Sequence, residues 1–232
     1  LWKERTSLLL SGRTTYSDWI MGMLPEKSGY KDGKAGFYDI GATFSHTFNN
    51  KHKLNLYGYY SRDRFAFNDN EKYGYGNMNL SAHWRAILSD QLIANFSAGY
   101  DHYDYKNDET VDSVQAARLS FSIDQYFAKA NFNWELEKHK LNFGASPLLY
   151  NIGAGTYEPL GNLSMVAYDK LQKDKALESA VYVGEEWEVT PKLSFNAGIR
   201  YSMFNALGPR DYYTYQPGTL PSASTIADTV RV

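Results

Sequence analysis

The side chains that most often carry catalysis or bind metals are scattered along this chain of 232 residues. The five histidines show no metal-ligand spacing of the H-E-x-x-H kind, and no cysteine is available for disulfides, thiolate metal sites or nucleophilic attack. Glu185, Glu186 and Glu188 lie close together, yet the sequence places no histidine, nucleophilic serine or partner carboxylate beside them. We therefore predict no catalytic residue, no metal site, no cofactor and no enzyme activity.

Two acidic segments are the remaining candidates for cation binding. The segment Asp101–Tyr105 (DHYDY) lies near the end of an extended stretch, where alternation sends Asp101 and His102 to opposite faces. Residues 68–71 (NDNE) lack the further ligands and the glycine placement of an EF-hand loop. A solvated acidic loop is the preferred interpretation of residues 68–71, and a cation site at 101–105 is the weaker alternative there.

The stretch Lys192–Met203 shows which element must position any functional side chain. Every second residue is apolar or aromatic (Leu193, Phe195, Ala197, Ile199, Tyr201, Met203), and the residues between them are polar or glycine. Side chains of a strand alternate between two faces, so this pattern predicts a strand with one apolar face and one polar face. Its length matches the roughly 9–11 residues that a strand needs to cross a bilayer.

The same alternation recurs along the chain and predicts nine strands with almost no helix. The only helical candidate, Leu171–Ser179, is better explained as loop or strand, and Pro147 predicts a bulge or a strand end. The predicted strands are Arg5–Trp19, Phe37–Phe48, Leu54–Phe65, Gly76–Ile87, Leu92–Tyr105, a long strand that ends near Glu135, Lys140–Tyr150, Leu177–Val189 and Lys192–Met203.

The predicted connections alternate between short and long. Short turns fall at 49–53, 88–91, 137–139 and 190–192; long loops fall at 20–36, 66–75, 106–114 and 151–176, and the tail 205–232 is predicted to be one more long loop. A membrane β-barrel has tight turns on the periplasmic side and longer loops outside. A soluble β-sandwich has no reason to sort its connections in this way.

The aromatic residues are also sorted by strand end. Trp84, Trp134 and Trp187 each lie on an apolar face shortly before a short turn, which predicts an interfacial aromatic girdle. The tyrosines gather toward the opposite ends (Tyr16, Tyr59, Tyr60, Tyr73, Tyr75, Tyr100, Tyr103, Tyr105). We therefore predict an all-β fold: an antiparallel up-and-down transmembrane β-barrel.

The predicted polar faces should line the lumen of this barrel. Their charged residues are Arg13, Asp39, Asp63, Arg85, Lys129, Glu135 and Arg200. In the last strand, Phe195 is expected to face lipid near the middle of the membrane and Asn196 the lumen. The net charge of −2 and the lack of a basic run argue against nucleic acid as a partner. The mean hydropathy of −0.52 does not exclude a barrel, because alternation hides apolar content.

Several segments together resemble the central barrel of a TonB-dependent outer-membrane receptor, of the type common in Bacteroidetes. They are Leu10–Tyr16 (LSGRTTY), Phe37–Ile40 (FYDI), Tyr59–Phe65 (YYSRDRF), Tyr75–Asn77 (YGN), Asn142–Gly144 (NFG) and Asn196–Tyr201 (NAGIRY). The resemblance implies a barrel of about 22 strands filled by a plug domain. On this interpretation residues 1–232 are a single partial barrel segment of about nine strands, without a plug domain.

The resemblance implies energised uptake of a ligand across the bacterial outer membrane. The implied partners are outer-membrane lipid, the remaining strands and plug of the same receptor, and the inner-membrane TonB energy-transducing complex. A surface lipoprotein stays open as a further partner. Tyrosine-rich loops suit a glycan, a siderophore or a peptide about equally, because an aromatic ring stacks on many flat groups. The alternative function is a passive porin-like, structural or adhesive barrel.

Overall fold

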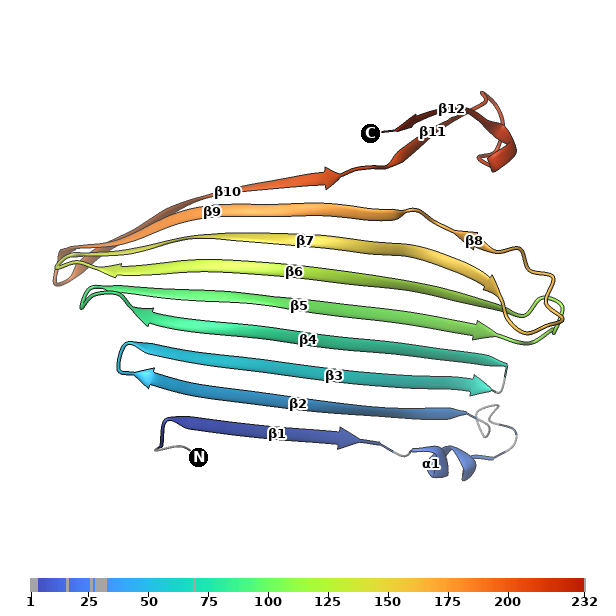
Figure 1. Ribbon diagram of the computed structural model, residues 1–232, viewed down its shortest axis with the longest axis horizontal. Coiled ribbons are helices and arrows are strands. Elements are labelled where there is room, and N and C mark those ends of the chain that lie inside the picture. Colours follow the sequence, from blue (N-terminus) through green and yellow to red (C-terminus); the bar gives the residue numbers. More distant parts are fainter. Residues whose placement is uncertain (1–3, 16, 26, 28–32, 69, 232) are drawn as a thin grey trace.

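The computed structural model describes residues 4–15, 17–25, 27, 33–68 and 70–231. They form a ten-stranded antiparallel sheet in which strands that follow one another in the chain lie side by side (Figure 1). The order is β1-β2-β3-β4-β5-β6-β7-β9-β10, and the short β8 pairs with β7 off this path. The predicted up-and-down arrangement of about nine strands is therefore confirmed.

The strands of the main path are long and join at tight turns on one side. Their bounds are β1 (Thr6–Thr14), β2 (Lys34–Asn49), β3 (His52–Asn68), β4 (Glu71–Ile87), β5 (Leu92–Glu109), β6 (Ala117–Glu135), β7 (His139–Pro159), β9 (Lys173–Thr190) and β10 (Leu193–Leu207). The remaining elements are α1 (Asp18–Gly22), β8 (Asp169–Lys170), β11 (Asp211–Tyr215), η3 (Ala223–Thr225) and β12 (Ile226–Arg231). All four predicted short turns are confirmed, since they lie between β2 and β3, β4 and β5, β6 and β7, and β9 and β10.

The connections at the opposite end differ from the prediction in one important place. The predicted loop 66–75 is wrong, because β3 continues to Asn68 and β4 begins at Glu71. The side-chain oxygen of Asn68 accepts hydrogen bonds from the backbone N–H groups of Asn70 and Glu71, at 2.8 and 3.0 Å, and so closes a tight turn. Gly74, inside the predicted loop, is a strand residue, and so is Gly76, where the strand was predicted to begin.

Other observed strand boundaries also differ from the predicted ones, mostly because the strands are longer at the end opposite the tight turns. β7 runs through Pro147, where we predicted a bulge or strand end, and its irregularity falls instead opposite Ser120 and Ser122. The segment Leu171–Ser179 enters β9 as strand. The tail was predicted to be one long loop, but β11 and β12 form a separate antiparallel hairpin there. The short helix α1 was not predicted.

The cross-strand register defines two faces. The apolar face contains one large apolar or aromatic side chain after another across the sheet: Ile40, Leu56, Leu80, Phe96, Phe132, Phe143, Val183 and Ile199. The polar face contains the residues between them. Among the described residues the fully buried apolar side chains are all alanines, so the sheet has no hydrophobic core of the kind a soluble sandwich needs. Instead Ile199 is 73% exposed and Ile40 59%.

No helix among the described residues is long and apolar enough to cross a membrane.

Candidate functional site

All seven charged residues proposed for the lumen lie on the polar face. Arg13 in β1 is the cross-strand partner of Asp39 in β2. Asp39 is in turn the partner of Ser61 in β3, and Ser61 that of Asn77 in β4, so these side chains share one face. Asp63, Arg85, Lys129, Glu135 and Arg200 share it by the same alternation. The polar face is therefore continuous from β1 to β10.

These charged residues differ in what they contact. Arg13 Nε donates to Asp39 Oδ2 at 2.9 Å, where the aspartate side chain is only 7% exposed. The ammonium group of Lys129 lies 5.7 Å from the ring centre of Phe127, and the Arg200 guanidinium lies 5.8 Å from that of Tyr182. Three others make no ion pair within the described part of the chain: Asp63, Arg85 and Glu135. One ion pair thus forms where the sequence suggested a row of charges.

Neutral and acidic side chains between these residues bond to one another from strand to strand. Ser45 donates to Asn55 at 2.8 Å, and Asn79 donates to Asp101 at 2.5 Å. Hydrogen bonds also join the pairs Ser61–Asn77, His83–Ser97 and Asn133–Asn142. A wall whose polar groups satisfy one another can border water or another polar surface without a cost of desolvation. The sequence analysis named the charges and missed this ladder of hydrogen bonds.

One contact on the polar face crosses a whole strand. The phenol of Tyr182 in β9 reaches over β7 and donates to Asn131 Oδ1 in β6 at 2.8 Å. It passes above Gly144, where an added Cβ would lie 2.7 Å from the tyrosine oxygen and 2.3 Å from the carbonyl oxygen of Ala130. Only glycine leaves room for this crossing.

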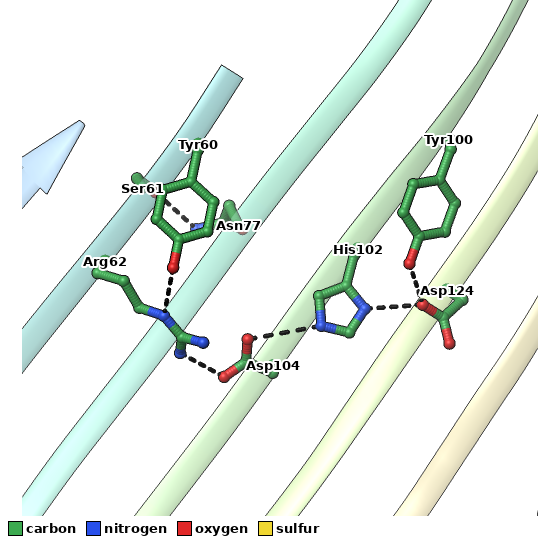
Figure 2. Close-up of polar contacts among 8 residues, drawn as sticks. All are labelled: Tyr60, Ser61, Arg62, Asn77, Tyr100, His102, Asp104 and Asp124. Carbon is green, nitrogen blue, oxygen red and sulfur yellow. Dashed lines mark hydrogen bonds and ion pairs between the residues drawn. The ribbon is translucent and has the colours of Figure 1, made fainter. Parts of the chain in front are cut away.

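A second crossing lies at the far end of the apolar face (Figure 2). Arg62 in β3 reaches over Gly76 of β4, and its Nη1 lies 2.5 Å from Asp104 Oδ2 in β5. Arg62 Nε also donates to the Tyr60 hydroxyl at 3.0 Å. The bond between Asn77 and Ser61, drawn beside it in Figure 2, belongs to the polar face.

The network continues from Asp104 into β6. His102 Nδ1 lies 2.7 Å from Asp124 Oδ1, and its Nε2 lies 3.5 Å from Asp104 Oδ1. The Tyr100 hydroxyl donates to Asp124 at 2.6 Å. The alternation of side chains could have assigned the residues of this network to the apolar face. Their contact could not be predicted from spacing, because Arg62 and Asp104 are 42 residues apart in the chain. The prediction that Asp101 and His102 take opposite faces is confirmed.

Farther out, the Arg118 guanidinium binds both carboxylate oxygens of Asp108, at 2.6 and 2.8 Å. These hydrogen bonds raise the pKa of Arg118 above its ordinary value. No group of three side chains that could hold a metal ion occurs among the described residues.

The three tryptophans lie on the apolar face near the tight turns. Trp84 and Phe96 pair across β4 and β5, with ring centres 5.4 Å apart. A row of rings continues through Phe132 and Phe143, at 5.8 and 5.1 Å. Trp134 and Trp187 are about as exposed as Trp84, at 40%, 44% and 43%.

The tyrosines near the opposite ends divide between the two faces. Tyr75 and Tyr105 stack on the polar face with ring centres 6.0 Å apart, whereas Tyr100 contacts Tyr126 on the apolar face at 4.9 Å. Tyr16, the first tyrosine of the predicted group, lies outside the described residues. The sequence therefore sorted these rings by strand end but not by face.

A meander of long strands with one exposed apolar face and one hydrogen-bonded polar face defines a membrane β-barrel wall. Residues 9–231 match the family described as "TonB dependent receptor-like, beta-barrel", and the chain belongs to this family of outer-membrane receptors and transporters. No curated protein matches the sequence.

Solved structures of similar fold are receptors and transporters as well. The ferric-catecholate import receptor Fiu from Escherichia coli, in its open form, is 10% identical, with a TM-score of 0.67, covering 100% of this chain and 46% of that one. A mutant of the ferric enterobactin receptor PfeA from Pseudomonas aeruginosa is 12% identical (TM-score 0.61; 87% of this chain, 35% of that one). The copper transporter OprC is 10% identical, with a TM-score of 0.62, and the match covers 87% of this chain and 33% of OprC. This chain thus spans less than half the length of these structures, and the likeness concerns the fold alone.

Proposed function

We propose that this chain forms part of the barrel wall of a receptor that imports a ligand across the outer membrane with energy from the TonB complex. Its apolar face meets lipid, and its polar face lines the lumen and contacts a plug domain. Trp84, Trp134 and Trp187 lie at the periplasmic boundary of the membrane. Family membership and the contrast between the two faces support this proposal.

The observation that carries the proposal is the ladder of hydrogen bonds along the polar face. Its Asn, Ser and Asp side chains bond to one another from strand to strand, so they form a continuous polar wall between the charged positions. Such a wall suits contact with a folded plug that must move past it. We propose Arg13, Asp39, Asp63, Arg85, Lys129, Glu135 and Arg200 as the charged positions of this wall. The ligand class stays open among glycan, siderophore and peptide, and a surface lipoprotein is a further partner to test.

Uptake by the full-length receptor tests the proposal. Cells expressing it are given a radiolabelled ferric catecholate, a fluorescent oligosaccharide or a fluorescent peptide, with and without a functional TonB complex. We expect uptake of one probe that stops when the complex is inactivated. Uptake that continues unchanged without the complex would favour the passive porin-like barrel instead.

The chain has no cysteine, so single-cysteine variants can test which face meets lipid. A fluorophore at Ile199→Cys should be quenched by brominated lipid, and a fluorophore at Ser202→Cys should not, because the two residues lie on opposite faces. The reverse pattern would invert the assignment of the faces.

A further inference from the structure

The alternation of side chains changes sense along β6. In the half near the tight turn, the rings of Phe132 and Trp134 lie on the apolar face, and the residues between and before them are asparagines of the polar face. In the other half, at the right in Figure 1, Leu119, Phe121 and Ile123 lie on the polar face, and the residues between them are serines. The apolar side chains of β6 thus pass from one face of the sheet to the other.

This change falls where β6 leaves the membrane on the proposed facing. A strand rises about 3.4 Å per residue and tilts by roughly 40° in a barrel, so the apolar band of about 25 Å takes about ten residues. Counted from Trp134 at the inner boundary, about ten residues along β6 lead to Asp124. The residues of β6 before Asp124 therefore stand outside the hydrocarbon, and their apolar side chains point toward the lumen.

Aromatic side chains of the neighbouring strands lie on the same face at this end. Tyr75, Tyr105 and Phe121 are cross-strand partners in one row, with ring centres 6.0 and 4.7 Å apart. Tyr103 contacts Phe121 from the next row, at 6.1 Å, and Leu119 is 41% exposed. An exposed apolar surface of this kind marks a binding site. We call the following set the outer apolar wall: Tyr75, Tyr103, Tyr105, Leu119, Phe121 and Ile123.

A carboxylate continues the row of rings. Asp63 in β3 is the cross-strand partner of Phe37 in β2 and of Tyr75 in β4, so an aromatic residue lies on each side of it. Asp63 makes no ion pair within the described part of the chain. A carboxylate beside aromatic rings suits an ammonium or guanidinium group of a ligand, because the ring faces also attract a cation.

The basic side chains at this end of the sheet lie on the other face. At the outer ends of β2 to β6, the described lysines and arginines all belong to the apolar face: Lys34, Arg62, Arg64, Lys72, Lys106 and Arg118. An anionic ligand such as a ferric catecholate would therefore meet the Asp63 carboxylate without a basic partner in the outer apolar wall. The wall favours a ligand without net negative charge.

The chemistry of the wall also favours a peptide over a glycan. Leu119 and Ile123 have no flat ring on which a sugar could stack, but they can bury the aliphatic side chains of a peptide. The amides nearest to the wall are engaged, since Asn77 donates to Ser61 and Asn79 donates to an aspartate. Sugar hydroxyls would have to compete with these hydrogen bonds.

We propose that the outer apolar wall binds peptides in which a basic side chain is flanked by apolar ones. The inference rests on the proposed function and names the ligand class of the receptor. The cationic group of the peptide contacts Asp63 between Phe37 and Tyr75. The apolar side chains of the peptide pack against Phe121 and Leu119, farther along the same face.

Peptide binding by the full-length receptor in detergent tests this site. The receptor is incubated with a tryptic digest of casein, and bound peptides are eluted and identified by mass spectrometry. We expect enrichment of peptides with apolar residues next to lysine or arginine. The most enriched peptide, labelled with a neutral fluorophore, is then compared with a copy in which norleucine replaces its basic residues. The uncharged copy should bind about tenfold more weakly, because it loses the charged partner of Asp63.

Asp63→Asn is the decisive variant, and Asp90→Asn, in the tight turn between β4 and β5, is its matched control. Asp63→Asn should weaken binding of the basic peptide by about tenfold and leave binding of the uncharged copy unchanged. Asp90→Asn should change neither. No enrichment of basic peptides by the wild type, which needs no variant to fold, would overturn the site. Binding of the basic peptide to Asp63→Asn at full strength would do the same.

The uptake experiment separates this inference from the proposed function. Uptake of a ferric catecholate or an oligosaccharide in place of the enriched peptide, if it stops without the TonB complex, would overturn the peptide class and leave the import function standing. Uptake of the enriched peptide that continues without the TonB complex would support the peptide class and overturn energised import.

Discussion

Among the described residues, a side chain crosses over a glycine of the intervening strand once on each face of the sheet. On the polar face the Tyr182 phenol passes over Gly144 to reach the amide of Asn131. On the apolar face the Arg62 guanidinium passes over Gly76 to reach the carboxylate of Asp104. One contact is neutral and the other is an ion pair, although the two use the same arrangement of three strands.

The difference fits the proposed facing, in which the apolar face meets lipid and the polar face lines the lumen. A neutral hydrogen bond suits a polar wall at any depth, because water or plug can solvate both partners. An ion pair on the apolar face costs least near the membrane boundary, where long side chains reach water. Gly76, over which Arg62 passes, lies toward the end of β4 opposite to Trp84, as this reasoning requires. The following variants, in the full-length receptor in lipid vesicles, test this contrast.

The largest effect should come from a charge placed in the middle of the apolar face. Phe195 pairs with Trp187, one of the three tryptophans proposed to mark the inner boundary, so on the proposed facing the midplane position is Ile199 and not Phe195. Ile199→Arg should cost about 2–4 kcal/mol of folding free energy, the range for arginine at the bilayer midplane. Heat-modifiable gel mobility across a urea series measures the folded fraction.

Ser202→Arg is the matched control, since Ser202 lies on the polar face of the same strand. It should leave the barrel folded, and Asn196→Arg should do so as well. Phe195→Arg should fall between these extremes, near 0–1 kcal/mol, because arginine costs less near an interface. If Ser202→Arg were the most damaging of these changes, the two faces would have to be exchanged.

The two crossing glycines should respond differently to a methyl group. At Gly144 a new Cβ would lie 2.3 Å from the backbone oxygen of Ala130, which cannot move without distorting β6. We expect Gly144→Ala to cost about 1–3 kcal/mol, as other overpacking changes do. At Gly76 the nearest atoms, at 2.6 and 2.8 Å, are the ends of the Asp104 and Arg62 side chains.

Those flexible ends can shift, so Gly76→Ala should cost less than about 1 kcal/mol. The same urea series compares the two variants. Similar costs for both would contradict the distinction between a backbone obstacle and a side-chain obstacle.

Much of this architecture could be predicted from the sequence, because the alternation of apolar and polar residues is visible within each strand by itself. The alternation of Leu193 to Met203, the positions of the three tryptophans and the four tight turns all follow from local pattern. These features need no knowledge of which strand lies beside which. They identify the faces of the sheet and its antiparallel order.

The crossings could not be predicted, because they depend on strands that are not consecutive. Gly74 lay in a predicted loop, and nothing in the local sequence explains Gly76, whose place is required by the contact between Arg62 and Asp104 on the two flanking strands. The tail was misread for a related reason. Pro209, Pro217 and Pro221 suggest a loop, but β11 and β12 pair on either side of the last two prolines.

Removing the charged crossing should have a moderate effect that depends on salt. Arg62→Met keeps most of the side-chain volume but leaves Asp104 with His102 as its remaining partner. We expect a cost of about 1–2 kcal/mol at low ionic strength, because Arg62 is 29% exposed and water weakens the pair. The cost should shrink when the urea series is repeated in about 1 M salt, where charges are screened beyond roughly 3 Å. A cost that is the same at both ionic strengths would argue against an ion pair.

Removing the neutral crossing should have the smallest effect, and salt should not change it. Tyr182→Phe deletes the hydroxyl that donates to Asn131 but keeps the ring above Gly144 and beside Arg200. The expected cost is about 0.5–1.5 kcal/mol, the net value of one neutral hydrogen bond. A double-mutant cycle with Asn131→Ala isolates this bond, since Tyr182→Phe should then cost close to nothing. A cost that persists in the Asn131→Ala background would place the role of the phenol elsewhere, and a cost that falls with salt would remove the difference between the two crossings.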